Sequence, residues 1–181
     1  AIYLTNKVYS PTAYISVSFP ALINETMRIL YWGIEQLQYD VYLNSLNTYY
    51  SFFIPTNNSL LEYIDPVSYG KSKTQLYRFY YHKTKVNKDE RVWASIWNYD
   101  AETGMLLDSV GKTTDVNVIK NRLKDILETH IVIGDIEDGH TYYRTKGGTE
   151  IRVNNVAAGA NGMTVEGSYQ INEGQPLAVS T

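Results

Sequence analysis

Three successive runs of β-type alternation occupy residues 74–110. Apolar and aromatic residues recur there at every second position, which is the period of a strand and not that of a helix. Polar, Gly-containing or charged segments at 87–90 and 101–104 separate the runs and are typical of turns. This pattern predicts a β-hairpin or meander at about 74–110.

Aromatic residues on the first two runs are the candidates for a binding surface. They are Tyr77, Phe79 and Tyr81 on the first run and Trp93, Trp97 and Tyr99 on the second. If both rows point outward, they form a platform that can stack on sugars or anchor a protein, with Arg78 and Lys83 beside it. If they point inward, they belong to the core, which the burial preferences of aromatic residues favour for some of them. The preferred contacts are Trp93, Trp97 and Tyr81.

Two segments carry the helical period instead. The first follows Asn24, a candidate N-cap, and the second runs from about Asp115 to Thr129. Their expected buried faces are Met27, Leu30, Ile34 and Leu37 in the first and Val116, Ile119, Leu123, Ile126 and His130 in the second. Short strands at the N-terminus and after His130 complete the pattern. The sequence therefore predicts an α+β fold.

The segment 52–61 changes from a strand to a polar corner. Pro55 ends the strand, because it forces the preceding residue into an extended conformation and has no N–H to donate. Thr56 or Asn57 then precedes a short apolar stretch and is a candidate cap for a short helix. We interpret this corner as a structural joint.

Composition limits the classes of function. The 181 residues are 44% apolar and 19% charged, as in an ordinary globular protein, and can form one domain with appendages. A net charge of −3 without a basic block argues against nucleic-acid binding. The lack of cysteine excludes thiol catalysis and disulfides within the chain. No apolar run reaches the length of a membrane-spanning helix.

Motifs for catalysis or cofactors are missing from the sequence. There is no nucleophile elbow, phosphate-binding loop or dinucleotide fingerprint. His82 and His140 are too far apart in sequence to form a ligand pair, and residues 134–140 fit a polar turn better than a calcium loop. We expect His130 to be a buried histidine that bonds backbone groups near the corner. The sequence thus assigns no catalytic residue, no metal and no cofactor, and we expect a protein without enzymatic activity.

Three blocks of the chain resemble the fasciclin (FAS1) domain family. They are 49–64, with the strand and Ile-Pro-Thr-Asn corner, 123–136, with a helix ending in His before Val-x-Gly, and 139–153, with Thr-x-x-Gly-x-x-Ile-x-Val spacing. The resemblance implies a wedge of two small β-sheets flanked by helices. It also implies that Pro55, Thr56, Asn57 and His130 are structural motif residues.

The chain departs from the family pattern in three places. Thr129 stands where the family has a Tyr before His, residues 74–110 look like an insertion, and the last strand block of the family is absent. Residues 1–22 resemble the tail of a preceding FAS1 domain, which would make 23–181 a FAS1-like domain without its usual final strand. A bolder interpretation is that Ile2–Val8 fills that vacant strand position.

The resemblance implies a non-enzymatic adhesion or protein-binding module of a tandem-FAS1 protein. The insertion resembles bacterial surface lipoproteins, which implies a cell-surface or outer-membrane location, a lipid anchor upstream, and a role as an accessory subunit of an outer-membrane assembly. The alternative is carbohydrate capture by the exposed aromatic residues. An inert spacer and an enzyme with paired carboxylates or a perturbed histidine are the remaining hypotheses.

Overall fold

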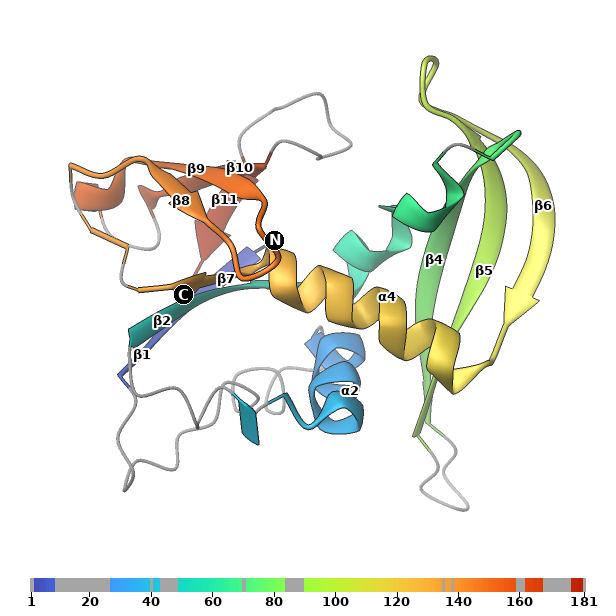
Figure 1. The fold of residues 1–181 in the computed structure, drawn as a ribbon, viewed down its shortest axis with the longest axis horizontal. Coiled ribbons are helices and arrows are strands. Elements are labelled where there is room, and N and C mark those ends of the chain that lie inside the picture. The colour runs from blue at the N-terminus through green and yellow to red at the C-terminus, as the bar shows by residue number, and fades with distance from the viewer. Residues whose placement is uncertain are drawn as a thin grey trace.

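The computed structural model describes residues 2–8, 27–39, 41–42, 49–69, 71–83, 90–134, 136–137, 139–158, 162–167 and 177–180. Within them the fold is α+β, as the sequence predicts. The helices α2 (Arg28–Leu37) and α4 (Val116–Thr129) lie between two β regions. Figure 1 shows a curved sheet on one side of α4 and a second group of strands on its other side.

The curved sheet has four antiparallel strands in the order β3-β4-β5-β6. Its strands are β3 (Tyr63–Ile64), β4 (Thr74–Lys83), β5 (Glu90–Asp100) and β6 (Met105–Thr113). The meander predicted from the alternation at 74–110 is therefore present. Two register shifts between β5 and β6 interrupt the pairing on either side of Trp97. Such bulges bend an edge strand and make it a poorer template for further pairing.

The second sheet has seven strands in the order β7-β2-β1-β11-β10-β9-β8. They are β1 (Ile2–Val8), β2 (Tyr49–Pro55), β7 (Ile131–Ile133), β8 (Tyr142–Arg144), β9 (Glu150–Asn154), β10 (Thr164–Gly167) and β11 (Leu177–Ser180). A short parallel pairing of β1 with β11 joins two antiparallel parts. One antiparallel bridge, Val132 to Thr145, also brings β8 back beside β7, so the sheet curls toward closure.

β1 pairs antiparallel with β2 along its whole length. This N-terminal strand thus lies inside the seven-stranded sheet, between β2 and β11. The predicted domain boundary near residue 22 falls at 9–26, outside the described residues, and stays a prediction.

Two separate apolar clusters form the interior. The larger joins α2 and α4 to β2, β4 and β5, and the smaller fills the curled sheet. Fully buried members of the larger cluster include Leu30, Ile34, Phe52, Phe79, Ile119 and Leu123. The smaller contains Phe53, Val132, Tyr143, Ile151, Val153, Met163 and Val165. Neighbouring residues of β2 thus face different cores, since successive side chains of a strand point to opposite sides.

The two helices differ in how they begin. Asp115 caps α4, because its Oδ1 accepts from the backbone N–H groups of Asn117 and Val118 at 2.9 and 3.4 Å. The predicted helix from 115 to 129 is confirmed, although Val116 is exposed. The first helix begins at Arg28, and the candidate cap Asn24 lies outside the described residues.

The corner after β2 supports that first helix. Asn57 Oδ1 accepts a hydrogen bond of 3.1 Å from the backbone N–H of Ile29, one of the first donors of α2. The short helix predicted after Pro55 is present as the 3₁₀ segment η2 (Asn57–Leu61), but its N-cap residue makes no side-chain cap. Thr56 lies at its N-cap position and contacts the Ser59 hydroxyl at 3.3 Å instead. The expected cap by Thr56 is wrong, and Asn57 bonds a helix distant in sequence.

Candidate binding site on the outer face of the four-stranded sheet

The register between β4 and β5 decides which aromatic residues are accessible. Tyr77 pairs with Ile96, Phe79 with Ala94 and Tyr81 with Val92. Tyr77 and Phe79 are 5% and 1% exposed and belong to the larger core, and Tyr81 packs against it. The row proposed for one side of the platform is therefore core. It faces the helices because its cross-strand partners Val92, Ala94 and Ile96 form the apolar side of β5.

The opposite face of the same strands turns away from α2 and α4 (Figure 1). There Tyr80 and Trp93 pair across the strands and stack, with ring centroids 4.5 Å apart and an angle of 24° between the planes. From β6, Lys112 places its Nζ 5.2 Å from the centre of the Trp93 ring. Trp93 is thus flanked by a tyrosine from one neighbouring strand and by a cation from the other.

Trp97 lies farther along the same face with a cation of its own. The guanidinium carbon of Arg78 is 5.7 Å from the Trp97 ring centre, and the indole Nε1 donates to the Ser95 hydroxyl at 3.0 Å. We call the set Arg78, Tyr80, Trp93, Trp97 and Lys112 the aromatic–cationic face. All five side chains extend from strands of the sheet. Two of them, Trp93 and Trp97, are among the three contacts that the sequence favoured.

A hollow of about 330 Å³ lies at the β5–β6 end of this face. Trp97 does not line it but lies next to it, because the lining residues Arg78 and Leu76 are its ring contact and its cross-strand partner. The residues that line the hollow are Glu62, Leu76, Arg78, Tyr99, Gly104, Met105 and Leu106. Leu76 and Tyr99 are 3% and 8% exposed and form its floor. Tyr99, a candidate contact from the sequence, is thus a buried lining residue and not part of an open platform.

The turn beside the hollow is held by its own backbone and one carboxylate. Gly104 has a φ of +70°, which suits glycine, and its N–H bonds the Asp100 carbonyl at 2.8 Å. Asp100 Oδ1 accepts from the N–H groups of Thr103 and Glu102, which lowers the pKa of this carboxyl group. The rim of the hollow is therefore preorganised.

Charge on the outer face has one sign over β4 and β5. Their outward positions in the register carry Arg78 and Arg91 but no aspartate or glutamate. Lys112 of β6 adds a third cation. Lys83, the other polar residue expected beside the platform, lies on the inner side of the register and pairs with Glu90 at 3.3 Å. Glu62 is the single carboxylate among the described residues that line the hollow.

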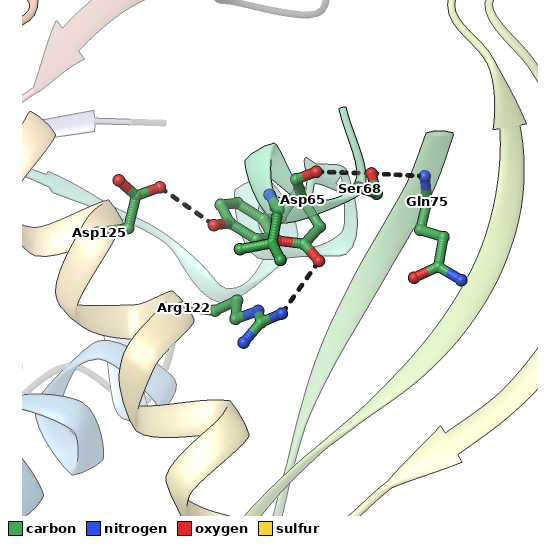
Figure 2. A network of polar contacts seen from close by, with 7 residues as sticks. Asp65, Ser68, Gln75, Arg122 and Asp125 are labelled. Atoms are coloured by element: carbon green, nitrogen blue, oxygen red, sulfur yellow. Dashed lines mark hydrogen bonds and ion pairs between the residues drawn. The ribbon is translucent and has the colours of Figure 1, made fainter. Parts of the chain in front are cut away.

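A buried ion pair lies on the inner side of the four-stranded sheet, which faces α4. Arg122 of α4 contacts Asp65, which is 1% exposed, with 3.1 Å between Nη2 and Oδ2. Figure 2 shows the polar network around this pair. Ser68 donates to the Asp65 carbonyl at 2.6 Å and accepts from the Gln75 N–H at 2.8 Å. These bonds connect α4 to β4 through the segment η3 (Pro66–Ser68).

Tyrosines complete the connection between α4 and the sheet. Tyr63 donates to Asp125 Oδ2 at 3.0 Å, and the Arg122 guanidinium lies 5.5 Å from the centre of the Tyr77 ring. Burial, followed by the nearby Asp125 carboxylate, raises the pKa of Tyr63 far above its usual value. Apart from Arg122 Nε, which has no hydrogen-bond partner among the described residues, these groups contact one another. We interpret the network as the joint that holds the four-stranded sheet against α4.

His130 occupies a structural position at the end of α4. Its Nδ1 lies 2.6 Å from the Ile126 carbonyl, and its own carbonyl accepts from the Phe53 N–H at 2.9 Å. Burial lowers the pKa of the ring, although the bond to Ile126 and the charge of Asp125 oppose that shift. The histidine joins α4 to β2 two residues before Pro55, next to the corner where the sequence places it.

The described part of the chain offers no constellation for a metal or a membrane span. No group of three or more histidine, aspartate or glutamate side chains in it could hold a metal ion. No helix in those residues is long and apolar enough to cross a membrane. No family model, no curated protein and no solved structure matches the chain.

Tyr80 and Lys112 are the site residues that sequence reasoning missed. The signal for Tyr80 was available, because Val92, Ala94 and Ile96 mark the inner side of β5 and an antiparallel register then sets Tyr80 beside Trp93. Lys112 gave no such signal, since the register shifts in β6 change which residues face outward.

Proposed function

We propose that this chain is a non-catalytic, FAS1-type binding module that recognises a protein partner at a cell surface through its aromatic–cationic face. The observation that carries the proposal is the cluster on the outer side of β4, β5 and β6: the Tyr80–Trp93 stack, the Arg78–Trp97 contact and Lys112. Tryptophan, tyrosine and arginine are the residues most enriched at the energetic centres of protein interfaces.

Ring geometry favours a protein over a sugar at Trp93. Stacking on a sugar needs a free aromatic face, and Trp93 is flanked by Tyr80 and Lys112. Its edge and the adjacent cations remain as contacts, and these suit a partner that brings apolar and acidic side chains. Several parts of this proposal rest on the sequence resemblance alone. They are the wedge-shaped fold, the FAS1 family, the adhesion role, and the place in a bacterial outer-membrane assembly with a lipid anchor upstream.

Carbohydrate capture is the second candidate, and the hollow beside Trp97 favours it. Tyr99, Glu62 and Arg78 line that hollow together with apolar side chains, and one sugar unit would fit. A neutral glycan would bind weakly and with little dependence on salt, because no charge of the ligand is neutralised. A glycan array probed with the chain and with its Trp97→Ala variant tests this candidate.

A pull-down from the native membrane tests the main proposal. The full-length protein is captured with its partners and compared with a Trp97→Ala variant and with a Tyr142→Ala variant, which changes an exposed tyrosine on β8. We expect one stoichiometric protein to be lost with Trp97→Ala and retained with Tyr142→Ala. Recovery of the wild-type protein alone, or equal recovery of the same protein with both variants, would contradict the proposed role of the face.

A further inference from the structure

We propose that the hollow beside Trp97 is an anchor site for an acidic–apolar peptide segment, in which Arg78 binds a carboxylate of the ligand and the floor takes the neighbouring apolar side chain. The inference rests on the proposed function, because it names the chemistry of the partner at the same face. Arg78 is the residue that both features share: it contacts Trp97 and lines the hollow.

Arg78 has unused hydrogen-bonding capacity. Its Nε is buried and has no hydrogen-bond partner among the described residues. A buried donor without a partner costs free energy, and a ligand oxygen that reaches Nε through a shift of the side chain removes this cost. Guanidinium groups match carboxylates in geometry, since two N–H groups can donate in parallel to the two oxygens. The contact with Trp97 restricts the side chain, so less entropy is lost on binding.

The floor and the charge of the surroundings define the rest of the ligand. Leu76, Leu106 and Met105 offer apolar surface, and Met105 is 62% exposed at the rim. With about 330 Å³, the hollow has the size for one large side chain and not for a folded element. Two outward cations attract an acidic segment here: Arg78 lines the hollow and Lys112 lies over Trp93. Arg91 pairs with His82 at the other end of the strands. A leucine or phenylalanine next to a glutamate meets these conditions.

Glu62 predicts the sign of a change in ligand affinity, which can be measured. It lines the hollow, is exposed, and would repel the carboxylate of an acidic ligand. Neutralising it should therefore strengthen the binding of an acidic peptide. A cationic ligand, or a sugar that donates to this carboxylate, would instead lose affinity. The two signs separate an acidic peptide from the other ligands that could enter the same hollow.

The experiment is an NMR titration of the ¹⁵N-labelled chain with two capped peptides, acetyl-Leu-Glu-Phe-Glu-amide and acetyl-Leu-Gln-Phe-Gln-amide. The indole N–H signals of Trp93 and Trp97 and the Nε–H signal of Arg78 report on the site. The indole of Trp32, which is 5% exposed in the core, is the internal control. We expect the Glu peptide to shift Trp97 and Arg78 but not Trp32, and to bind about tenfold more tightly than the Gln peptide.

Two variants and the salt dependence complete the test. Arg78→Gln should remove the preference for the Glu peptide, and Glu62→Gln, on an exposed side chain, should tighten its binding about two- to threefold. Raising the salt concentration should weaken it. Equal binding of both peptides, no shift at Trp97 with either, or weaker binding to Glu62→Gln overturns the inference. If the peptides fail to bind but a protein is still captured through Trp97, only the inference about the ligand is refuted. If the Glu peptide binds as expected but no protein is captured through Trp97, only the proposed function is refuted.

Discussion

Arg122 of α4 reaches Asp65 at the end of β3, and their side chains meet at 3.1 Å in the interior between helix and sheet. Figure 2 shows the pair between α4 and the segment that leads into β4, with the contacts of Ser68 and Asp125 beside it. Because the sheet carries the aromatic–cationic face, this pair, together with the apolar core between helix and sheet, orients the candidate site relative to α4.

Removing one charge of this pair should lower the stability of the fold more than removing both. Arg122→Met leaves Asp65 as a buried charge without its counterion, which should lower the free energy of unfolding by about 3 kcal/mol. The double variant Arg122→Met/Asp65→Asn removes both charges and should recover part of that loss. Urea unfolding followed by circular dichroism measures both. A double variant no more stable than Arg122→Met would show that the charge left behind is not the cause.

Gly33 and Leu123 set the distance between the two helices. A Cβ at position 33 would lie 3.0 Å from Leu123 Cδ1, which is tighter than ordinary packing. Leu123→Ala should cost about 3 kcal/mol, because the side chain is fully buried. Adding Gly33→Ala to it should recover about 1 kcal/mol, since the added methyl fills part of the cavity and alanine favours the helix. Additive effects in a double-mutant cycle would contradict this contact.

Asp115 stabilises the start of α4 through its side chain. Asp115→Ala removes the bonds to two backbone N–H groups and should lower stability by about 1 kcal/mol. Thr114→Ala is the control, because this neighbouring residue is exposed and makes no cap. Thermal unfolding should separate the two variants, and an equal effect of both would argue against the cap.

His130 should make stability depend on pH. Its pKa is lowered in the folded chain, so the unfolded chain binds the proton more readily. Its contribution is therefore complete above the unfolded pKa near 6.5 and declines as the pH falls below that value. We expect less loss of stability between about pH 7.5 and 5.5 in His130→Asn, which cannot titrate there, than in the wild type or in His82→Asn, an exposed histidine. Parallel pH profiles for all three would show that His130 does not titrate with folding.

Local patterns predicted the elements well and the site only in part. The helix after Asp115 was predictable because a cap and an apolar period agree there. The orientation of β4 could not be predicted from β4 alone, because Tyr77, Phe79 and Tyr81 on one side and Tyr80 and Leu76 on the other are all apolar or aromatic. The pairing of β4 with β5 resolves this ambiguity, and that pairing cannot be deduced from the sequence of one strand. The Asn57–Ile29 and Arg122–Asp65 contacts join residues far apart in the chain, which periodicity cannot reveal.

The outer side of β4, β5 and β6 should contact a protein partner in the intact cell. Photo-crosslinking in intact cells tests it with a photoreactive phenylalanine at Tyr80, on that face, and at Tyr142, which is 55% exposed on β8. Both positions replace a tyrosine by another aromatic residue, so folding should be preserved. We expect a discrete protein adduct from position 80 and none from position 142. No adduct from position 80, or the same adduct from both positions, would contradict it.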